Sequence, residues 1–313
     1  MNQGPNTSPS YWVSIVNHRI SAFTGQSIVA FALLLTASPI LHAQGSYEVT
    51  TGFWIPILPS YEQASASDQT RDERLSDPVA LGGQIGFQGL YHFQPTRTML
   101  EFDLNIAYAD GVTSGSISQL GTTETVDGDI FHHSQYIGLR DRFDLTGWRL
   151  GILDIGCGFS HLRYDQNLTS RTSPASFMLD ESINNDYLGG EVRSSITQMI
   201  HNCPVTLDFN VGIFDLDGRT QSSLAYDYGA GTGILPVGVA SPNFDTTAFT
   251  IDLGMRWQTS FCGLTTTPSI SFKYISDMVT ITHPDQLTTS GYTNIGARSE
   301  EAYFVSLNLE FLL

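Results

Sequence analysis

The stretch Tyr303–Leu313 reads Tyr-Phe-Val-Ser-Leu-Asn-Leu-Glu-Phe-Leu-Leu and decides the class of fold. Its odd-numbered residues are all apolar or aromatic, whereas Ser306, Asn308 and Glu310 lie at alternate positions between them. Successive side chains of a β-strand point to opposite faces. This two-residue period therefore predicts a strand with one apolar face and one polar face.

Nine further segments upstream carry comparable strand patterns, so we expect ten strands in all. Met99–Tyr108 is among the clearest, because apolar residues alternate there with Glu101, Asp103 and Asn105. The candidate strands are Tyr47–Leu58, Leu81–Phe93, Met99–Tyr108, Phe131–Phe143, Trp148–Tyr164, Tyr187–Met199, Val205–Phe214, Ala248–Gln258, Ser269–Ile281 and Glu301–Leu313. A change of phase near Ile152 predicts a β-bulge in the fifth strand.

The predicted connections between these strands alternate regularly between short and long. The short connections are Gln94–Arg97, Asp144–Gly147, Ile200–Pro204 and Thr259–Leu264. The long connections are Pro59–Ala80, Asp110–Asp129, Asp165–Asn185, Asp215–Thr247 and Thr282–Ser299. Bacterial outer-membrane barrels sort their connections in this way, with short periplasmic turns and long extracellular loops.

The N-terminal region has the pattern of an export signal. Ile28–Leu35 is a continuous apolar run, and Leu41–Ala43 follows it as a candidate cleavage site. The run is shorter than the roughly 20 residues that a membrane-spanning helix needs. We therefore expect residues 1–43 to be a cleaved signal peptide and residues 44–313 to form the mature domain.

Together these patterns predict an all-β fold, a single antiparallel transmembrane β-barrel of about ten strands in the cell outer membrane. Its expected partners are outer-membrane lipid and the barrel assembly machinery. Aromatic residues near both sets of connections, among them Trp54, Trp257 and Phe249, predict two interfacial girdles. A soluble periplasmic β-sandwich is the alternative fold.

The composition restricts the function further. The formal net charge is −17, which argues against a nucleic-acid partner because such partners need a basic face. The chain has three cysteines. Cys157 lies within a predicted strand and is expected to be packed, whereas Cys203 and Cys262 lie in short turns on the same side and can form a disulfide.

Charged residues at the polar positions of the strands are the main candidate site, and they predict a charge network in the lumen. They are Glu48, Glu101, Asp103, Arg140, Arg142, Asp154, Glu191, Arg193, Asp208, Asp252, Arg256, Lys273 and Glu310. Asp208 is expected near Glu191 and Arg193, and Arg256 near Lys273 and Asp252. These charges can line a pore that selects ions, or they can pair with one another and fill a narrow lumen.

Two sequence patterns suggest hydrolysis or calcium binding as other candidate activities. The omptin proteases are ten-stranded barrels with acidic and histidine residues at the extracellular rim, and this chain has Asp127, Asp129, His132 and His133 together, with Asp215 and Asp217 farther on. An Asp–His pair can activate water, but no omptin motif matches residue by residue. The run from Asp215 to Gly218 begins like a calcium loop and lacks the later acidic ligands. We therefore expect no catalytic residues, no metal site and no cofactor.

A family resemblance rests on two stretches. Tyr136–Tyr164 is a strand, a tight turn and a strand that ends in Gly-Phe-Ser-His-Leu-Arg-Tyr, and Tyr187–Thr197 reads Tyr-Leu-Gly-Gly-Glu-Val-Arg-Ser-Ser-Ile-Thr. These stretches resemble the Legionella major outer-membrane protein family and its β-barrel relatives in planctomycetes. The resemblance implies a porin-like or surface protein and transfers no catalytic residues. The chain departs from many barrels at its end, where two leucines follow Phe311.

The sequence thus predicts a porin-like or structural surface protein with a narrow charged lumen. The alternatives are an adhesin or receptor that acts through its long loops, and a hydrolase with a site at the rim.

Overall fold

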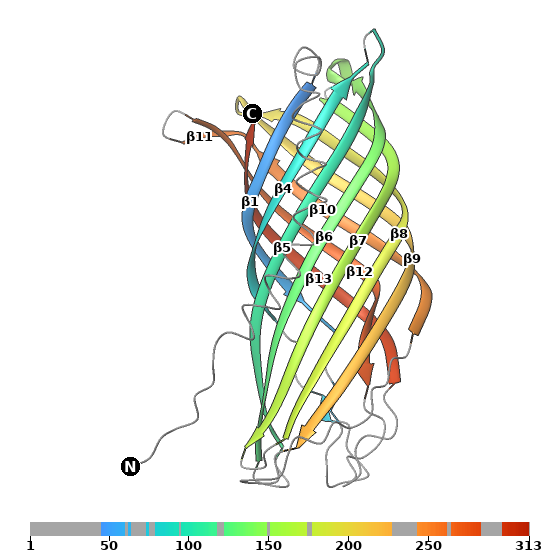
Figure 1. The fold of residues 1–313 in the computed structure, drawn as a ribbon. Coiled ribbons are helices and arrows are strands. Elements are labelled where there is room, and N and C mark those ends of the chain that lie inside the picture. The colour runs from blue at the N-terminus through green and yellow to red at the C-terminus, as the bar shows by residue number, and fades with distance from the viewer. Residues whose placement is uncertain are drawn as a thin grey trace, which may run out of the picture. The chain divides into compact units, whose positions relative to one another are not determined.

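The computed structural model confirms the predicted class of fold, a closed antiparallel β-barrel of ten strands (Figure 1). The structure describes residues 45–59, 62–63, 73–74, 79–93, 95–117, 122–148, 151–173, 177–226, 243–261, 264–282 and 296–312. The barrel strands are β1 (Gly45–Ile57), β4 (Leu81–His92), β5 (Thr98–Ile117), β6 (Thr122–Asp144), β7 (Ile152–Ser173), β8 (Phe177–Ile200), β9 (Cys203–Tyr226), β10 (Asn243–Trp257), β12 (Leu264–Thr282) and β13 (Gly296–Leu312). The predicted signal peptide, residues 1–43, lies outside the described residues.

The barrel closes because its first and last strands pair. β1 and β13 run antiparallel, from Glu48 opposite Leu312 to Ile57 opposite Tyr303. β12 joins β13 to β10, and the remaining strands follow one another in chain order back to β4 and β1. The sheet is therefore closed around the barrel, as lipid requires of a sheet whose backbone groups cannot bond to water. Among the described residues, no helix is long and apolar enough to cross a membrane.

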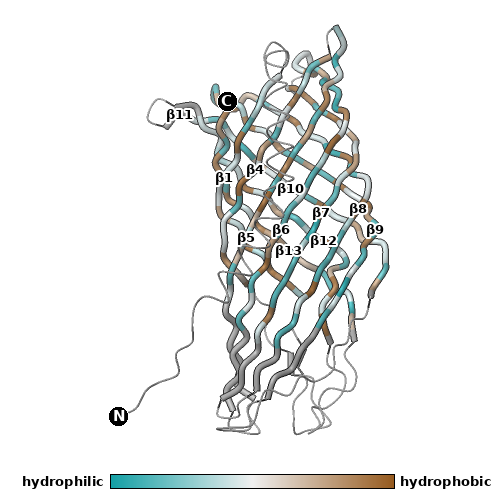
Figure 2. The backbone as a smooth tube through the Cα atoms, viewed as in Figure 1, coloured by the Kyte–Doolittle hydropathy of each residue, from teal (hydrophilic) through white to brown (hydrophobic). Residues whose placement is uncertain are grey.

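The outer face of the wall is apolar over a broad belt, and Figure 2 shows apolar and polar residues alternating along the strands. Phe159 on β7, Val192 on β8, Phe209 on β9 and Leu309 on β13 all expose their side chains to the outside. Neighbouring residues in the same strands point inward and are buried or partly buried. This arrangement is the reverse of a soluble barrel, and it makes the chain a transmembrane barrel of the outer-membrane type.

The four short connections lie at the end of the barrel that holds the C-terminus, uppermost in Figure 1. β8 and β9 are joined by His201 and Asn202, whose φ angles of 49° and 64° form the tight turn that twisted hairpins favour. Between β6 and β7, the Thr146 hydroxyl and amide donate to Asp144 Oδ1 at 2.6 and 2.9 Å. These hydrogen bonds hold the pKa of the Asp144 carboxyl below its usual range.

The short connection between β10 and β12 contains a strand that the sequence analysis did not predict. It contains β11 (Thr259–Phe261), which pairs with the start of β12 as a two-stranded hairpin. Figure 1 shows β11 projecting from the wall at the short-turn end.

The predicted long connections Asp110–Asp129 and Asp165–Asn185 are wrong, because both stretches are largely strand. β5 and β6 stay paired as far as Ile117 and Thr122, and β7 and β8 as far as Arg171 and Met178. The strands continue because serine, threonine and polar pairs satisfy a ladder outside the membrane as well as apolar residues do inside it. The barrel wall therefore extends well past the apolar belt at its long-loop end.

The predicted bulge near Ile152 is also wrong. β7 begins at Ile152, and Gly151 before it has a φ of 80°, so the change of phase marks the end of a turn. A register shift occurs instead in β12, between Ile275 and Met278.

The lipid-facing belt supports a first prediction. Val192→Arg places a charge near the middle of the belt and should destabilise the barrel by about 2–4 kcal/mol. Urea unfolding in lipid vesicles measures the change. Gln221→Arg is the matched control, because Gln221 is exposed beyond the belt and its replacement should change stability by less than about 0.5 kcal/mol. Equal effects of the two substitutions would argue against a lipid-facing wall.

Candidate functional site

The lumen near the short-turn end holds all thirteen charged residues of the predicted network. Each of them takes part in at least one ion pair. They include eight carboxylates and five cations, so the negative charges are in excess.

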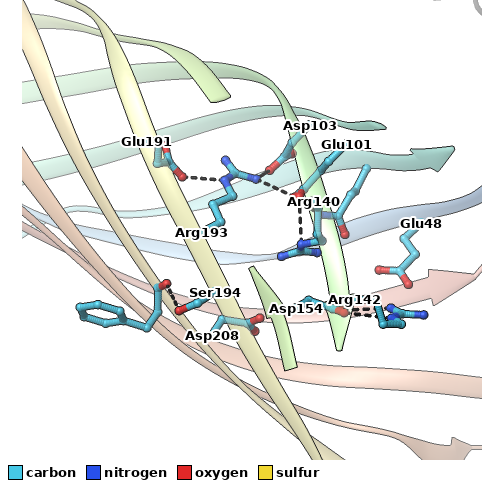
Figure 3. Close-up of polar contacts among 12 residues, drawn as sticks. Glu48, Glu101, Asp103, Arg140, Arg142, Asp154, Glu191, Arg193, Ser194 and Asp208 are labelled. Carbon is cyan, nitrogen blue, oxygen red and sulfur yellow. Dashed lines mark hydrogen bonds and ion pairs between the residues drawn. The ribbon is translucent and has the colours of Figure 1, made fainter. Parts of the chain in front are cut away.

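Arg193 on β8 is the centre of the larger cluster (Figure 3). Its guanidinium contacts Glu191 at 2.6 Å and, across the lumen on β5, Glu101 and Asp103 at 3.1 Å each. Its Cζ atom lies 3.6 Å from the centre of the Tyr136 ring, a cation–π contact. Because β8 and β5 are not neighbours in the wall, Arg193 ties opposite sides of the barrel together.

Glu101 extends this cluster. Its Oε2 atom lies 3.2 Å from Arg140 Nε, and Gln88 donates to its Oε1 atom at 3.0 Å. Glu101 and Arg140 are both almost fully buried. Buried charges of this kind persist only when they are paired, so the cluster depends on all its members.

Arg256 on β10 is the centre of a second cluster. It contacts Asp208 at 3.3 Å, Glu310 at 3.6 Å and Glu48 at 3.8 Å. The expected contact of Asp208 with Glu191 and Arg193 is therefore not made, because Asp208 faces Arg256 on the adjacent strand.

Two further pairs complete the network. Arg142 on β6 binds Asp154 on β7 with two hydrogen bonds of 2.9 and 3.0 Å. Lys273 on β12 lies 3.8 Å from Asp252 on β10. Arg256 was expected near these two residues, but its ion pairs are made with Asp208, Glu310 and Glu48 instead.

A layer of four aromatic rings closes the lumen on the long-loop side of the charges. Trp54 of β1 stacks on Phe304 of β13 at 5.6 Å, and Phe304 stacks on Tyr164 of β7 at 5.0 Å. Tyr164 stacks on His132 of β6 at 4.2 Å, and His132 returns to Trp54 at 5.8 Å. All four side chains are at most 4% exposed. Trp54 therefore lies in the lumen, and its predicted place in an interfacial girdle is wrong.

Beyond this layer the lumen contains an apolar core. Its residues come from strands around the wall and include Ile130, Tyr187, Phe214, Met278 and Val279. A closed ten-stranded barrel has a narrow interior, and side chains of this size fill it.

The β12–β13 hairpin contributes to that core by bending into the lumen after the register shift. The Asn185 side chain on β8 accepts a hydrogen bond from Val279 N at 2.7 Å and donates to Val279 O at 3.3 Å. The Tyr187 hydroxyl donates to Asp277 O at 2.8 Å. β8 is not a neighbour of β12 in the wall, so these bonds cross the lumen and hold the hairpin inside it.

A polar cavity of ≈ 240 Å³ remains between the aromatic layer and the short-turn end. Trp54, Tyr164 and Phe304 line one end, and most of the other lining residues have charged, amide or hydroxyl side chains. The described residues contain no group of three or more His, Cys, Asp or Glu side chains that could hold a metal ion.

The candidate rim residues do not meet in one place. His132 faces the lumen, where its Nδ1 atom lies 3.1 Å from Arg163 O, whereas Asp129 pairs with Asn167. Because side chains alternate along β6, His132 and Asp129 lie on opposite faces of the wall.

An Asp–His pair that sequence reasoning missed lies on the outer face. His161 Nε2 on β7 is 2.7 Å from Asp186 Oδ1 on β8, and the His133 ring on β6 is 5.3 Å from the His161 ring. These residues are far apart in sequence, and only the strand register places them side by side.

The cysteines differ from the prediction in part. Cys157 is exposed on the outer face, because its position in β7 alternates with inward residues, and is not packed in the interior. The Cys203 Sγ atom lies 2.9 Å from Gln258 O. Cys262 lies outside the described residues, so the Cys203–Cys262 disulfide stays a prediction.

Neither a family model nor a curated protein sequence matches the chain. Among solved structures, the outer membrane protease OmpT from Escherichia coli has a TM-score of 0.47 at 6% identity, over 86% of this chain and 97% of that one. The translocator domain of the autotransporter NalP from Neisseria meningitidis has a TM-score of 0.38 at 10% identity, over 93% and 97%. A major outer membrane protein from Thermus thermophilus has a TM-score of 0.37 at 10% identity, over 86% and 99%. These are likenesses of fold alone, and the family resemblance stays a prediction.

The Arg193 cluster supports a second prediction. Arg193→Met should destabilise the barrel by about 3–5 kcal/mol, because it leaves Glu101, Asp103 and Glu191 without their shared cation. Urea unfolding measures the loss. Arg219→Met is the control, since Arg219 pairs with Asp217 on the exposed outer face and its removal should leave stability almost unchanged. A loss below about 1 kcal/mol for Arg193→Met would contradict a structural role for the cluster.

Proposed function

We propose that the chain is a structural surface protein of the outer membrane whose lumen is sealed, and that it is not an open porin. The observation that carries this proposal is the aromatic layer of Trp54, His132, Tyr164 and Phe304, backed by the apolar core. A solute crossing the barrel would have to displace both. Diffusion pores instead keep a water-filled lumen along their whole length.

In this proposal the charge network holds the strands of the barrel wall in register. Arg193 joins β8 to β5, and Arg256 joins β10 to β9, β1 and β13. Such contacts specify strand register, because a slip by one residue would turn every charge toward lipid. The excess of carboxylates gives the lumen a negative potential without making it a passage.

The long-loop end carries the surface role. A transmembrane strand needs about 9–11 residues, whereas β8 and β9 have 24 residues each. The additional length raises the β5–β9 wall above the membrane at the end that outer-membrane barrels turn outward.

The raised wall favours a second candidate function, an adhesin or receptor that acts through this end. The outer face there is polar, with Arg163 on Asp165 and Arg219 on Asp217. Exposed polar connections on a rigid scaffold are where binding residues collect. Removal of residues 227–242 and an assay of cell binding test this candidate, since binding that survives would exclude that loop.

The sealed lumen gives a third prediction. Purified wild-type protein should show no stable conductance in a planar bilayer. A variant in which a short Gly-Ser linker replaces residues 277–300, with Trp54→Ala and Phe304→Ala, removes the inward hairpin and part of the aromatic layer. It should conduct, because water can then fill the lumen.

The deletion of residues 227–242 is the matched control. It should show no conductance, because it shortens a connection without changing the core residues. Folding of every variant is checked by heat-modifiable gel migration. Steady conductance of the wild-type protein would overturn the proposed function.

A further inference from the structure

The polar cavity has groups that the barrel itself does not use. Thr50, Asn105, Ser134, Asn210 and Ser271 line it, and none of them makes a side-chain hydrogen bond to the described part of the chain. The charged residues in the same lining form ion pairs within the lumen. The hydrogen-bonding capacity available inside the cavity is therefore mostly neutral.

These free groups converge from around the wall. Thr50 lies on β1, Asn105 and Ser134 face each other in the β5–β6 ladder, Asn210 lies on β9 and Ser271 on β12. Amides and hydroxyls both donate and accept hydrogen bonds. An occupant that satisfied them would need donors and acceptors on several of its sides, which is the property of a polyhydroxylated molecule.

Two buried polar atoms also point to a polar occupant. Glu101 Oε2 and Arg140 Nε are buried without a hydrogen bond to the described residues, although the two atoms form an ion pair at 3.2 Å. Both residues line the cavity. Buried polar atoms in native proteins usually have a protein, water or ligand partner, so a hydroxyl group in the cavity would complete this pair.

The closed end of the cavity is apolar. Trp54, Tyr164 and Phe304 line it, and they are nearly inaccessible, whereas the Glu48 and Asp103 side chains are each 30% exposed. The cavity therefore opens away from the aromatic layer, toward the short-turn end. Binding sites for small molecules combine apolar walls with a few placed polar groups in this way.

We propose that this cavity binds a neutral polyhydroxylated solute of the size of a single sugar ring, which enters from the short-turn, periplasmic end. The free amides and hydroxyls bond to its hydroxyl groups, and its less polar face lies against the aromatic layer. An inorganic anion fits less well because the lumen has an excess of carboxylates, and a polyamine fits less well because it would pair with those carboxylates without using the free amides and hydroxyls.

Trp54 provides the measurement. The mature protein with Trp148→Phe and Trp257→Phe retains Trp54 as its reporter at the cavity wall. D-glucose and myo-inositol are titrated while Trp54 fluorescence is recorded, and putrescine and sodium phosphate are titrated in parallel. We expect a saturable change with at least one of the two neutral compounds and none with the charged ones.

The double variant Asn105→Leu and Asn210→Leu should weaken that binding by about tenfold or more, because it removes two free amides. Asn167→Leu is the matched control, since Asn167 bonds to Asp129 on the outer face, and it should leave binding unchanged. If the double variant fails to fold, as judged by heat-modifiable migration, Ser134→Ala with Ser271→Ala replaces it.

Failure of both neutral compounds to saturate the signal would overturn the proposal. So would unchanged binding in the cavity variants, or saturation by putrescine or phosphate in their place. Conductance tests the sealed lumen separately, so either proposal can fail alone.

Discussion

The whole structure depends on one constraint, that a chain in lipid must pair its own backbone N–H and C=O groups. The β1–β13 ladder meets this constraint by joining the two ends of the sheet. Once the wall is closed, alternation along each strand assigns every side chain to lipid or to the lumen. The apolar belt and the interior network therefore follow from the same ladder.

A narrow closed wall creates a second requirement, because its interior has to be filled. This barrel fills its interior in three zones along the axis. Ion pairs around Arg193 and Arg256 occupy the short-turn half, the aromatic layer follows, and the apolar core with the inward β12–β13 hairpin occupies the long-loop half. The three zones explain how a lumen rich in charge can also be sealed.

The inward hairpin shows how a local irregularity acts on the whole interior. The pairing of β12 with β10 ends at Ile275, and after the register shift the end of β12 stays paired with β13. Asn185 then supplies to Val279 the hydrogen bonds that a neighbouring strand would otherwise provide. Buried backbone groups have to be paired, so a single amide on β8 makes the bend possible.

Much of the fold was predictable from local pattern, because a two-residue period is visible in any single strand. All ten strands and the thirteen inward charges could be read from alternation in segments such as Tyr303–Leu313, whereas the places of Trp54 and Cys157 were predicted wrongly. The strand ends beyond the membrane were missed at Ile117 and Ser173, because polar ladders there lack an apolar face to reveal them.

Local sequence pattern sets which face of the wall a residue takes, since that depends on its neighbours along the chain. Which residues meet depends on the folded barrel, because strand register and the bend in β12 are set by contacts between residues far apart in sequence. Arg193 with Glu101, Trp54 with His132 and Asn185 with Val279 are all meetings of this kind. These long-range contacts close the lumen and leave the polar cavity. The two features that bear on function therefore depend on contacts that the local sequence pattern does not reveal.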